Sequence, residues 1–425
     1  MSVFLYLFLL VSGLQTTIHC VQYNISEGKV TTFHLPQQNA TLYKMSSINA
    51  GFAFSLYHRF PVENPDWNIF FSPESTSAAL AMFSFGSGSN TQTPILEVLG
   101  FNLTHTPITE LHQGFQHLIC SLNFPKNELE LQKRNAVFIG QQLKTLARVL
   151  DDIKTLYETE VFPIDFSNVS AAQQEINSYV EKQAKGKIID LIQDLRLNII
   201  MILVNYIHFK AQWANPFHVS KTEESSSFSV DKTTAIQVPM MHHLEQCYHF
   251  LDVKLNCTVL RMDYSENALA RSVLPKEGHI EGVETTMSSK TLKKSNYLLK
   301  KGYTQMCVPK FSISATYDLG STLQKMGMRD AFAESADLPG ITRDNGLKLS
   351  YCVFLSHRFF HKAVLHIGEQ GTKEVAAPAA VSLEQPEVAS LHPIIQFDRT
   401  FLLMVLEKRT RSIIFLGKVI NSAKE

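Results

Sequence analysis

The chain has 425 residues, of which 45% are hydrophobic and 18% are charged, and this balance suits a globular protein with a sizeable core. Its 39 basic and 39 acidic residues cancel to a formal net charge of zero. General binding to nucleic acid or to a membrane surface relies on an excess of basic charge. The composition therefore argues against both kinds of partner.

Residues 1–20 have the pattern of a signal peptide. An apolar run from Val3 to Val11 is too short to span a bilayer and is followed by small and polar residues up to Cys20. We expect these residues to be removed on secretion and residues 21–46 to form a polar N-terminal tail. No later apolar run is long enough to span a membrane, so a soluble extracellular protein is expected.

Glycosylation triplets support secretion, and they lie at Asn24, Asn39, Asn102, Asn168 and Asn256. Loss of Cys20 would leave an odd number of cysteines with no closely spaced pair. We therefore predict no disulfide framework, no zinc site and mostly buried thiols. Enzyme motifs such as G-x-S-x-G, the P-loop and H-E-x-x-H are absent, so neither catalysis nor a cofactor or metal is expected.

The first half of the chain is predicted to alternate helices with buried strands. Helical periodicity starts at Ser47 and stops at Pro61, and a short strand then leads into a helix beginning at Ser72-Pro73. Further helices are expected over residues 106–122, 143–158 and 170–186. Residues 198–209 form an apolar run typical of a strand buried on both faces.

Strands dominate the second half. Short strands are expected from about residue 225 to 313, interrupted by one helix near 281–301. The apolar residues 401–406 and 413–420 predict a terminal hairpin. Mixed helices and strands without a composition break indicate one α+β domain.

Between the two, residues 361–386 have an unusual composition. They open with period-two apolar residues, break at Gly371, and continue through small Val and Ala residues to Pro386. Composition alone favours a surface loop, because small side chains bury little.

Four blocks give this loop a context, and in their order and spacing they resemble the serpins: residues 68–73, 205–217, 308–311 and 415–419. The resemblance implies one serpin domain over residues 47–425, with a large central sheet, two smaller sheets, eight to nine helices and a mobile reactive-centre loop at about 371–391. It also implies a control region beneath the sheet in which Ser72, Asn205 and His361 hydrogen-bond, with Trp213 packed where the loop enters.

Two residue patterns argue against the family's protease-inhibiting activity. Family spacing from Gly371 and Thr372 places the scissile bond at Gln385-Pro386, and proline makes this a poor bond for serine proteases. On insertion of the loop, Glu374 and Pro378 would face the core. Burying the Glu374 carboxylate would cost free energy, and Pro378 could not donate a hydrogen bond in a central strand. We expect loop cleavage by proteases rather than their inhibition.

Further segments resemble the hormone-carrying serpins of blood plasma, namely residues 40–49, 114–123, 288–294 and 392–396. This resemblance implies transport of thyroxine by a monomer, with release modulated by loop insertion and a pocket formed by Ser46, Leu292, Lys293, Asn296, Lys408 and Arg411. A corticosteroid carrier and a serine protease inhibitor remain the alternatives. Lys408 stands where the family has arginine, and Arg271 and Ser272 stand where it has apolar residues, so a buried Arg271 would need a partner.

A last departure lies between Ser350 and His361, where residues 351–360 exceed the length in relatives by about seven residues. Sliding the strand by an odd number would exchange its two faces. We therefore expect these residues to loop out with exposed aromatic side chains, or to mark an altered transcript, which is the interpretation we favour.

Overall fold

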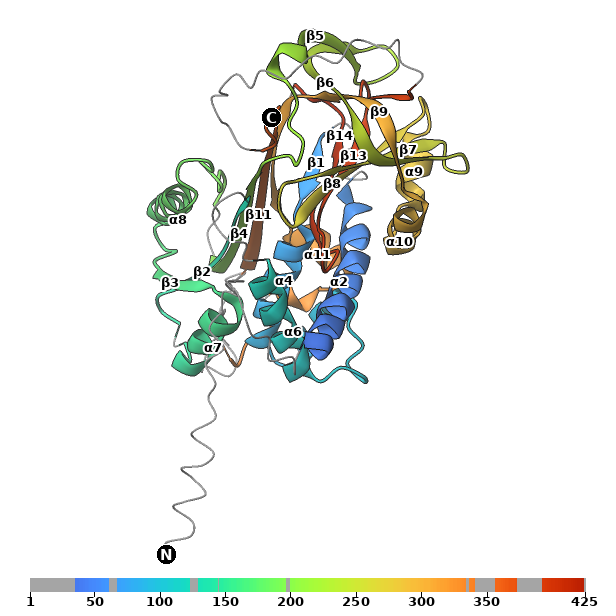
Figure 1. Ribbon diagram of the computed structural model, residues 1–425. Helices are drawn as coiled ribbons and strands as arrows, with labels where there is room; N and C mark the ends of the chain where they lie inside the picture. Colours follow the sequence, from blue (N-terminus) through green and yellow to red (C-terminus); the bar gives the residue numbers. More distant parts are fainter. Residues whose placement is uncertain are drawn as a thin grey trace, which may run out of the picture. The chain divides into compact units, whose positions relative to one another are not determined.

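Two β-sheets and the helices packed on them make up the computed structural model (Figure 1). The structure describes residues 35–60, 67–122, 129–143, 145–195, 199–333, 336–340, 356–372 and 392–423. The account below concerns the unit from Asn39 to Glu425.

A five-stranded sheet forms around β4 (Ile199–Ala211), in the order β10-β11-β4-β2-β3. Strand β11 (Ser356–Ile367) runs parallel to β4 and antiparallel to β10 (Phe311–Asp318). On the other side of β4 lie β2 (Leu129–Gly140) and then β3 (Glu160–Ile164). The apolar run around residue 200 is thus a central strand, as predicted.

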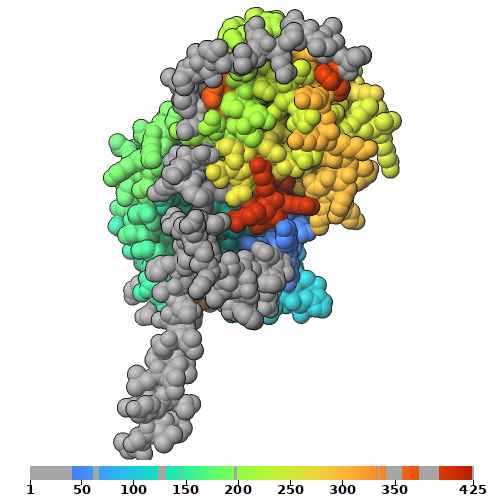
Figure 2. All heavy atoms as spheres, in the orientation of Figure 1, coloured from blue at the N-terminus to red at the C-terminus, as the bar shows by residue number. Residues whose placement is uncertain are grey.

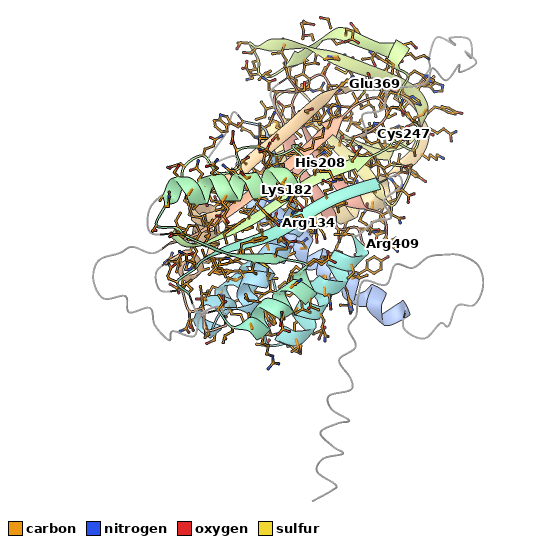
Figure 3. The ribbon with its side chains drawn as sticks, turned by 90° about the vertical axis from the view of Figure 1, so that its left-hand side faces the viewer. Arg134, Lys182, His208, Cys247, Glu369 and Arg409 are labelled. Carbon is orange, nitrogen blue, oxygen red and sulfur yellow. The ribbon has the colours of Figure 1, made fainter. Side chains whose placement is uncertain are left out.

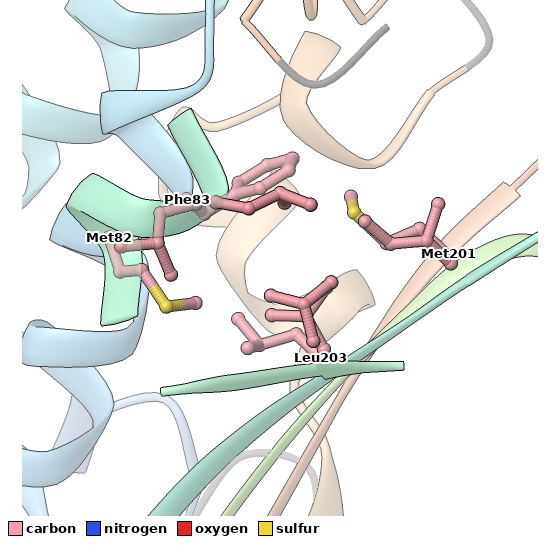
Figure 4. A pocket seen from close by; sticks show the side chains of 9 residues that line it. Met82, Phe83, Met201 and Leu203 are labelled. Atoms are coloured by element: carbon pink, nitrogen blue, oxygen red, sulfur yellow. The ribbon is translucent and has the colours of Figure 1, made fainter. Parts of the chain in front are cut away.

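Both faces of β4 are covered by helices, which explains why its apolar residues do not alternate with polar ones. Met201 and Leu203 face α4 (Pro73–Phe85), where they line a small apolar pocket together with Met82 and Phe83 (Figure 4). The intervening residues of β4, among them Ile202 and Val204, pack in the cluster that contains α8 (Val169–Gln183).

The second sheet has nine strands, and its described members form one hydrogen-bonded sheet where the family resemblance implied two. The long strand β6 (Ala235–Asp252) joins them, because it pairs along its length with three neighbours. The other strands are β1 (Ile69–Phe71), β14 (Ile413–Val419), β13 (Phe401–Glu407), β8 (Ala268–Pro275), β7 (Cys257–Asp263), β9 (Lys300–Pro309), β12 (Ile394–Gln396) and β5 (Thr222–Ser229).

Two helix predictions need correction. Helix α2 (Leu35–Tyr57) begins well before Ser47, so the end of the expected polar tail is helical. The helix expected near 281–301 is two helices, α9 (Ile280–Thr286) and α10 (Ser289–Leu298). Ser288 separates them, because its hydroxyl accepts from the N–H of Thr291 in a capping box.

Three helices match their expected positions to within a few residues: α6 (Ile108–Ser121), α7 (Ala147–Tyr157) and α8. Helices α5 (Ser89–Val98) and α11 (Gly320–Met326) were not predicted, and short 3-10 turns lie at Val219–Lys221 and Asp330–Phe332. No helix in the described ranges is long and apolar enough to cross a membrane.

The cysteines follow the predicted pattern except at one position. Cys247, Cys257 and Cys307 are buried thiols, as predicted, and burial raises the pKa of each to about 11. Cys120, however, is disulfide-bonded, a bond that the prediction of no disulfide framework and mostly buried thiols did not include. Disulfide pairing depends on proximity in the fold, which spacing along the chain does not reveal.

The prediction that residues 351–360 loop out is wrong for Ser356–Phe360, which are the first residues of β11. Phe359 pairs with Leu203 and is 0% exposed, and Phe360 pairs with Val204 and is 5% exposed. Residues 351–355 lie outside the described ranges. Arg358 stabilises this start of the strand, since its guanidinium lies 2.7 Å from a carboxylate oxygen of Asp318 and 4.6 Å from the centroid of the Phe360 ring.

Truncation of Phe359 should therefore destabilise the protein. We expect Phe359→Ala to cost about 3–5 kcal/mol, the usual range for a buried phenylalanine, because a cavity opens in the core that packs on this face of the sheet. The measurement is the melting temperature, with Leu251→Ala, at a side chain 55% exposed, as the control. Equal melting temperatures for the two variants would show that Phe359 is not packed in the core.

Candidate functional site

A buried hydrogen-bond network joins α4 to the two central strands of the five-stranded sheet. The backbone N–H of Ser72 donates to Nε2 of His361 (3.0 Å), and Nδ1 of His361 lies 2.6 Å from Oδ1 of Asn205. Because Nε2 accepts, Nδ1 carries the proton and donates to Asn205. The Nδ2 of Asn205 donates in turn to Ser75 (2.5 Å) and Asn135 (2.6 Å), partners that the sequence did not indicate.

This network needs a neutral imidazole. His361 is 0% exposed, and its burial lowers its pKa to about 3. A second proton would sit on Nε2, directly opposite the Ser72 N–H that now donates to it. Protonation would therefore break the contact between β11 and α4.

The hinge of the reactive loop lies at the end of β4. Thr372 is buried, its N–H donates to the carbonyl of Ala211 (2.7 Å), and its hydroxyl also bonds to that residue. Gly371 has φ +112°, and a Cβ there would lie 2.4 Å from the same carbonyl, so only glycine fits this position. Glu374, Pro378, Gln385 and Pro386 lie outside the described residues.

Trp213 anchors the segment before the hinge. Its indole N–H donates to the carbonyl of Gly368 (3.0 Å), and its ring stacks on Tyr264 with centroids 4.2 Å apart. Glu369, labelled in Figure 3, accepts from Thr222 (3.1 Å) and lies 3.1 Å from Nζ of Lys310. These bonds hold Gly368 and Glu369 against three other segments.

Three elements bring the expected hormone-site residues together: α2, α10 and the turn between β13 and β14. Ser46 of α2 shares a 2.5 Å hydrogen bond with Ser412 of the turn. Lys293 of α10 donates to Ser47 of α2 (2.8 Å). Figure 2 shows part of the C-terminal segment (red) at the surface beside α2 (blue) and the gold to orange segment around residue 300.

The turn is shaped by a buried carboxylate. Glu407 is 0% exposed, and it accepts from the hydroxyl of Thr410 (2.7 Å) and from Nε of Arg409 (3.2 Å), which is labelled in Figure 3. Arg411, which follows Thr410, has φ +61° and an exposed side chain. Glu407 thus fixes the turn and presents Arg411 to solvent.

Lys408 does not join the other expected site residues. Its ammonium donates to the carbonyls of Tyr264 (2.9 Å) and Glu266 (2.8 Å), on the turn between β7 and β8. Desolvation lowers its pKa. These two bonds hold Lys408 at the β7–β8 turn, and its expected place in the pocket stays a prediction.

Arg271 of β8 packs against α10, and its guanidinium contacts Leu292 and Asn296 of the expected site. It is 2% exposed and donates to Oδ1 of Asn296 (2.5 Å), the hydroxyl of Ser295 (3.1 Å) and the carbonyl of Leu292 (3.4 Å). Burial, with a smaller effect of Arg261 and Arg411, lowers its pKa to about 10, so it stays charged at neutral pH. Its neighbour Ser272 is also buried.

The glycosylation triplets that the structure describes differ in exposure. Asn102 and Asn168 are exposed, and Asn256 is partly exposed in a left-handed turn (φ +49°). Side-chain placement at Asn24 and Asn39 is not described. Glycosylation stays a prediction for all five. No group of three or more His, Cys, Asp or Glu residues suited to a metal ion occurs in the described part of the chain.

Three features together define a class of protein. They are a five-stranded sheet in which β11 pairs directly with β4, the hydrogen-bond network between these strands and α4, and the expected loop hinge. The family model for Serpin (serine protease inhibitor) matches residues 47–422, so the chain belongs to the serpin family. Among its relatives, thyroxine-binding globulin of Rattus norvegicus is 78% identical over 425 residues, with 100% of each chain covered.

Solved structures agree with this relation. Human thyroxine-binding globulin in complex with thyroxine is 66% identical, with a TM-score of 0.84, and the match covers 90% of this chain and 100% of that one. The reactive-loop-cleaved form of the human protein is 69% identical, with a TM-score of 0.73, covering 78% and 96%.

Acidification should unfold the protein through His361. Its pKa is about 3 when folded and about 6.5 when unfolded, so between these values the unfolded chain binds more protons and stability falls as pH falls. One such group adds a slope of about 1.4 kcal/mol per pH unit. Burial also lowers the pKa values of His112 and His357 to about 4, so they contribute in the same direction.

We expect His361→Gln to melt at a lower temperature than the wild type at pH 7.5, because the network is weakened. Its further loss of stability from pH 7.5 to pH 5 should be smaller than that of the wild type, because one titrating group is gone. The measurement is the melting temperature across this range. Identical pH slopes for the two proteins would contradict the assignment.

Proposed function

We propose that the chain is a secreted, non-inhibitory serpin that binds and transports thyroxine, one molecule per monomer. The observation that carries the proposal is the full-length similarity to thyroxine-binding globulins. Residues expected to hold the hormone also converge on α2, α10 and the β13–β14 turn. The steroid-carrier alternative has no comparable support.

The chemistry of this region suits an iodothyronine, which has two apolar rings and a zwitterionic amino-acid end. The aliphatic stem of Lys293 is exposed along α10 beside Leu292 and offers an apolar wall. The Nδ2 of Asn296 is a donor at the same helix, and Arg411 is an exposed guanidinium able to pair with a carboxylate. A steroid has no charged group for these residues to recognise.

We also propose that loop entry modulates hormone release, and a contiguous set of contacts supports this. Gly371 bridges to Gln212, next to Trp213, which stacks on Tyr264. The carbonyl of Tyr264 accepts from Lys408, and Lys408 belongs to the turn that presents Arg411. A change at the hinge can thus shift one side of the site through few intermediates.

Removal of the Asn296 amide should weaken thyroxine binding. We expect Asn296→Ala to cost about 1–2 kcal/mol of binding free energy, the usual loss of a hydrogen bond to a charged or polar partner. The control is Tyr297→Ala, at the next residue, whose side chain is 84% exposed. Fluorescence titration with thyroxine, with a corticosteroid and retinol as competitors, provides the measurement. Absence of saturable thyroxine binding, or a steroid bound at least tenfold more tightly, would refute the proposed function.

Serine proteases should cut the loop without being trapped. Pro386 hinders attack at the expected bond, and Glu374 and Pro378 oppose rapid insertion. Incubation with trypsin-like, chymotrypsin-like and elastase-like proteases, followed by denaturing electrophoresis, should give cleaved chain and no covalent complex. An SDS-stable complex with any of these proteases would restore the inhibitor alternative.

A further inference from the structure

The buried guanidinium of Arg271 has hydrogen bonds but no counterion in the part of the chain that the structure describes. Its Nη atoms donate to three oxygens of α10, all of them uncharged. Its Nε has no hydrogen-bond partner among the described residues. A buried cation normally pairs with an anion, since desolvation costs several kcal/mol and neutral oxygens offset only part of it.

Arg261, the cross-strand partner of Arg271 on β7, shows the ordinary arrangement. Its Nε and Nη2 lie 2.9 and 3.1 Å from the two carboxylate oxygens of Asp263, and it covers the ring of Tyr248. Two arginines at one register position of the same sheet therefore differ in two respects. The Arg261 side chain is 27% exposed and has a carboxylate partner, whereas Arg271 is 2% exposed and has none among the described residues.

The charges that act on Arg271 are positive. Arg261 and Arg411 both disfavour its charged form. Because Asp263 offsets the charge of Arg261, Arg271 and Arg411 are the guanidinium groups that would attract an anion near α10. The partly buried position gives this attraction more strength than it would have in water.

Arg271 also orients Asn296. Because Oδ1 of Asn296 accepts from Nη2 of Arg271, the amide cannot flip, and its Nδ2 donor points away from the guanidinium. Asn296 is only partly buried, so this donor is available at the surface of α10. The pair thus offers a fixed N–H donor backed by a positive charge.

We propose that Arg271 selects for the carboxylate of the hormone, by orienting the Asn296 amide that receives it and by offering a buried positive charge for which the described residues supply no acid. This inference rests on the proposed thyroxine site. Arg271 is a positioning and specificity-determining residue, and it explains how the site tolerates an arginine where serpin relatives of this class were expected to have an apolar residue.

A purely structural role gives different expectations. The guanidinium lies near the C-terminal end of α10, where a positive charge also stabilises the helix dipole and free carbonyls. In that role, loss of Arg271 would lower stability and weaken every ligand alike. A carboxylate-selective role changes the ratio between ligands.

The experiment compares three ligands: thyroxine, its decarboxylated amine analogue, and a des-amino analogue that keeps a carboxylate. Each is titrated against the wild type, Arg271→Gln, Arg271→Lys and Arg261→Gln. The last variant is the matched control, since it removes one positive charge from the same register position. Melting temperatures of the unliganded proteins report folding separately.

We expect the wild type to bind both carboxylate ligands at least about tenfold more tightly than the amine, as for a hydrogen bond from a neutral donor to a charged acceptor. Arg271→Gln should bring the three affinities to within about threefold of one another, mainly by weakening the carboxylate ligands. Arg271→Lys should keep part of the preference, because the charge remains while the orienting fork is lost. Arg261→Gln should leave the preference within about twofold of the wild type.

Several results would overturn the inference. They are an unchanged ratio in Arg271→Gln, an equal loss for all three ligands, tighter thyroxine binding in that variant, or a wild type without carboxylate preference. If Arg271→Gln does not fold, the ratio in Arg271→Lys decides, and an unchanged ratio there refutes the orienting role. A wild type that fails to bind thyroxine at all refutes the proposed function instead.

Discussion

Strand β11 pairs directly with β4 inside the five-stranded sheet, and the position of the hinge depends on this parallel pairing. Register is fixed at its centre by the hydrogen bond between His361 and Asn205, two residues that face each other across the pair. A shift by one residue would exchange the faces of β11, removing His361 from the network and Phe359 from the core. The same register places Gly371 opposite Gln212 and allows Thr372 to bond at Ala211. Further entry of the loop would have to separate β11 from β4, so the His361 network opposes it.

Contacts near the end of β4 link the five-stranded sheet to the second sheet. Trp213 lies two residues after the end of β4, and its stacking partner Tyr264 begins the turn between β7 and β8 that holds Lys408. Lys408 thus has a structural part of its own, since its ammonium is bonded to two carbonyls.

Periodicity was sufficient for elements whose stability is local or fully buried. The run in β4, the terminal hairpin and the Ser72-Pro73 helix start were all predictable because burial on two faces, alternation and capping leave direct marks in sequence. The start of β11 was not predictable in this way. Ser356–Phe360 belongs to the segment that is longer than expected of relatives, and from sequence it was interpreted as an insertion. Its aromatic residues nevertheless pair with Leu203 and Val204 on a strand far away in sequence. Tertiary pairing decides such a segment. The same holds for Cys120 and for the break between α9 and α10.

The candidate site divides along the same line. Resemblance predicted Ser46, Leu292, Lys293, Asn296 and Arg411 as site residues, but their geometry depends on residues with no motif of their own, such as Ser412 and Glu407. From the sequence it was open which partner a buried Arg271 would have. Among the described residues its partners are three neutral acceptors and no acid. Local rules that a protein breaks without internal compensation are expected at functional sites. A ligand that carries its own carboxylate offers the compensation that this chain omits, and it does so only when bound.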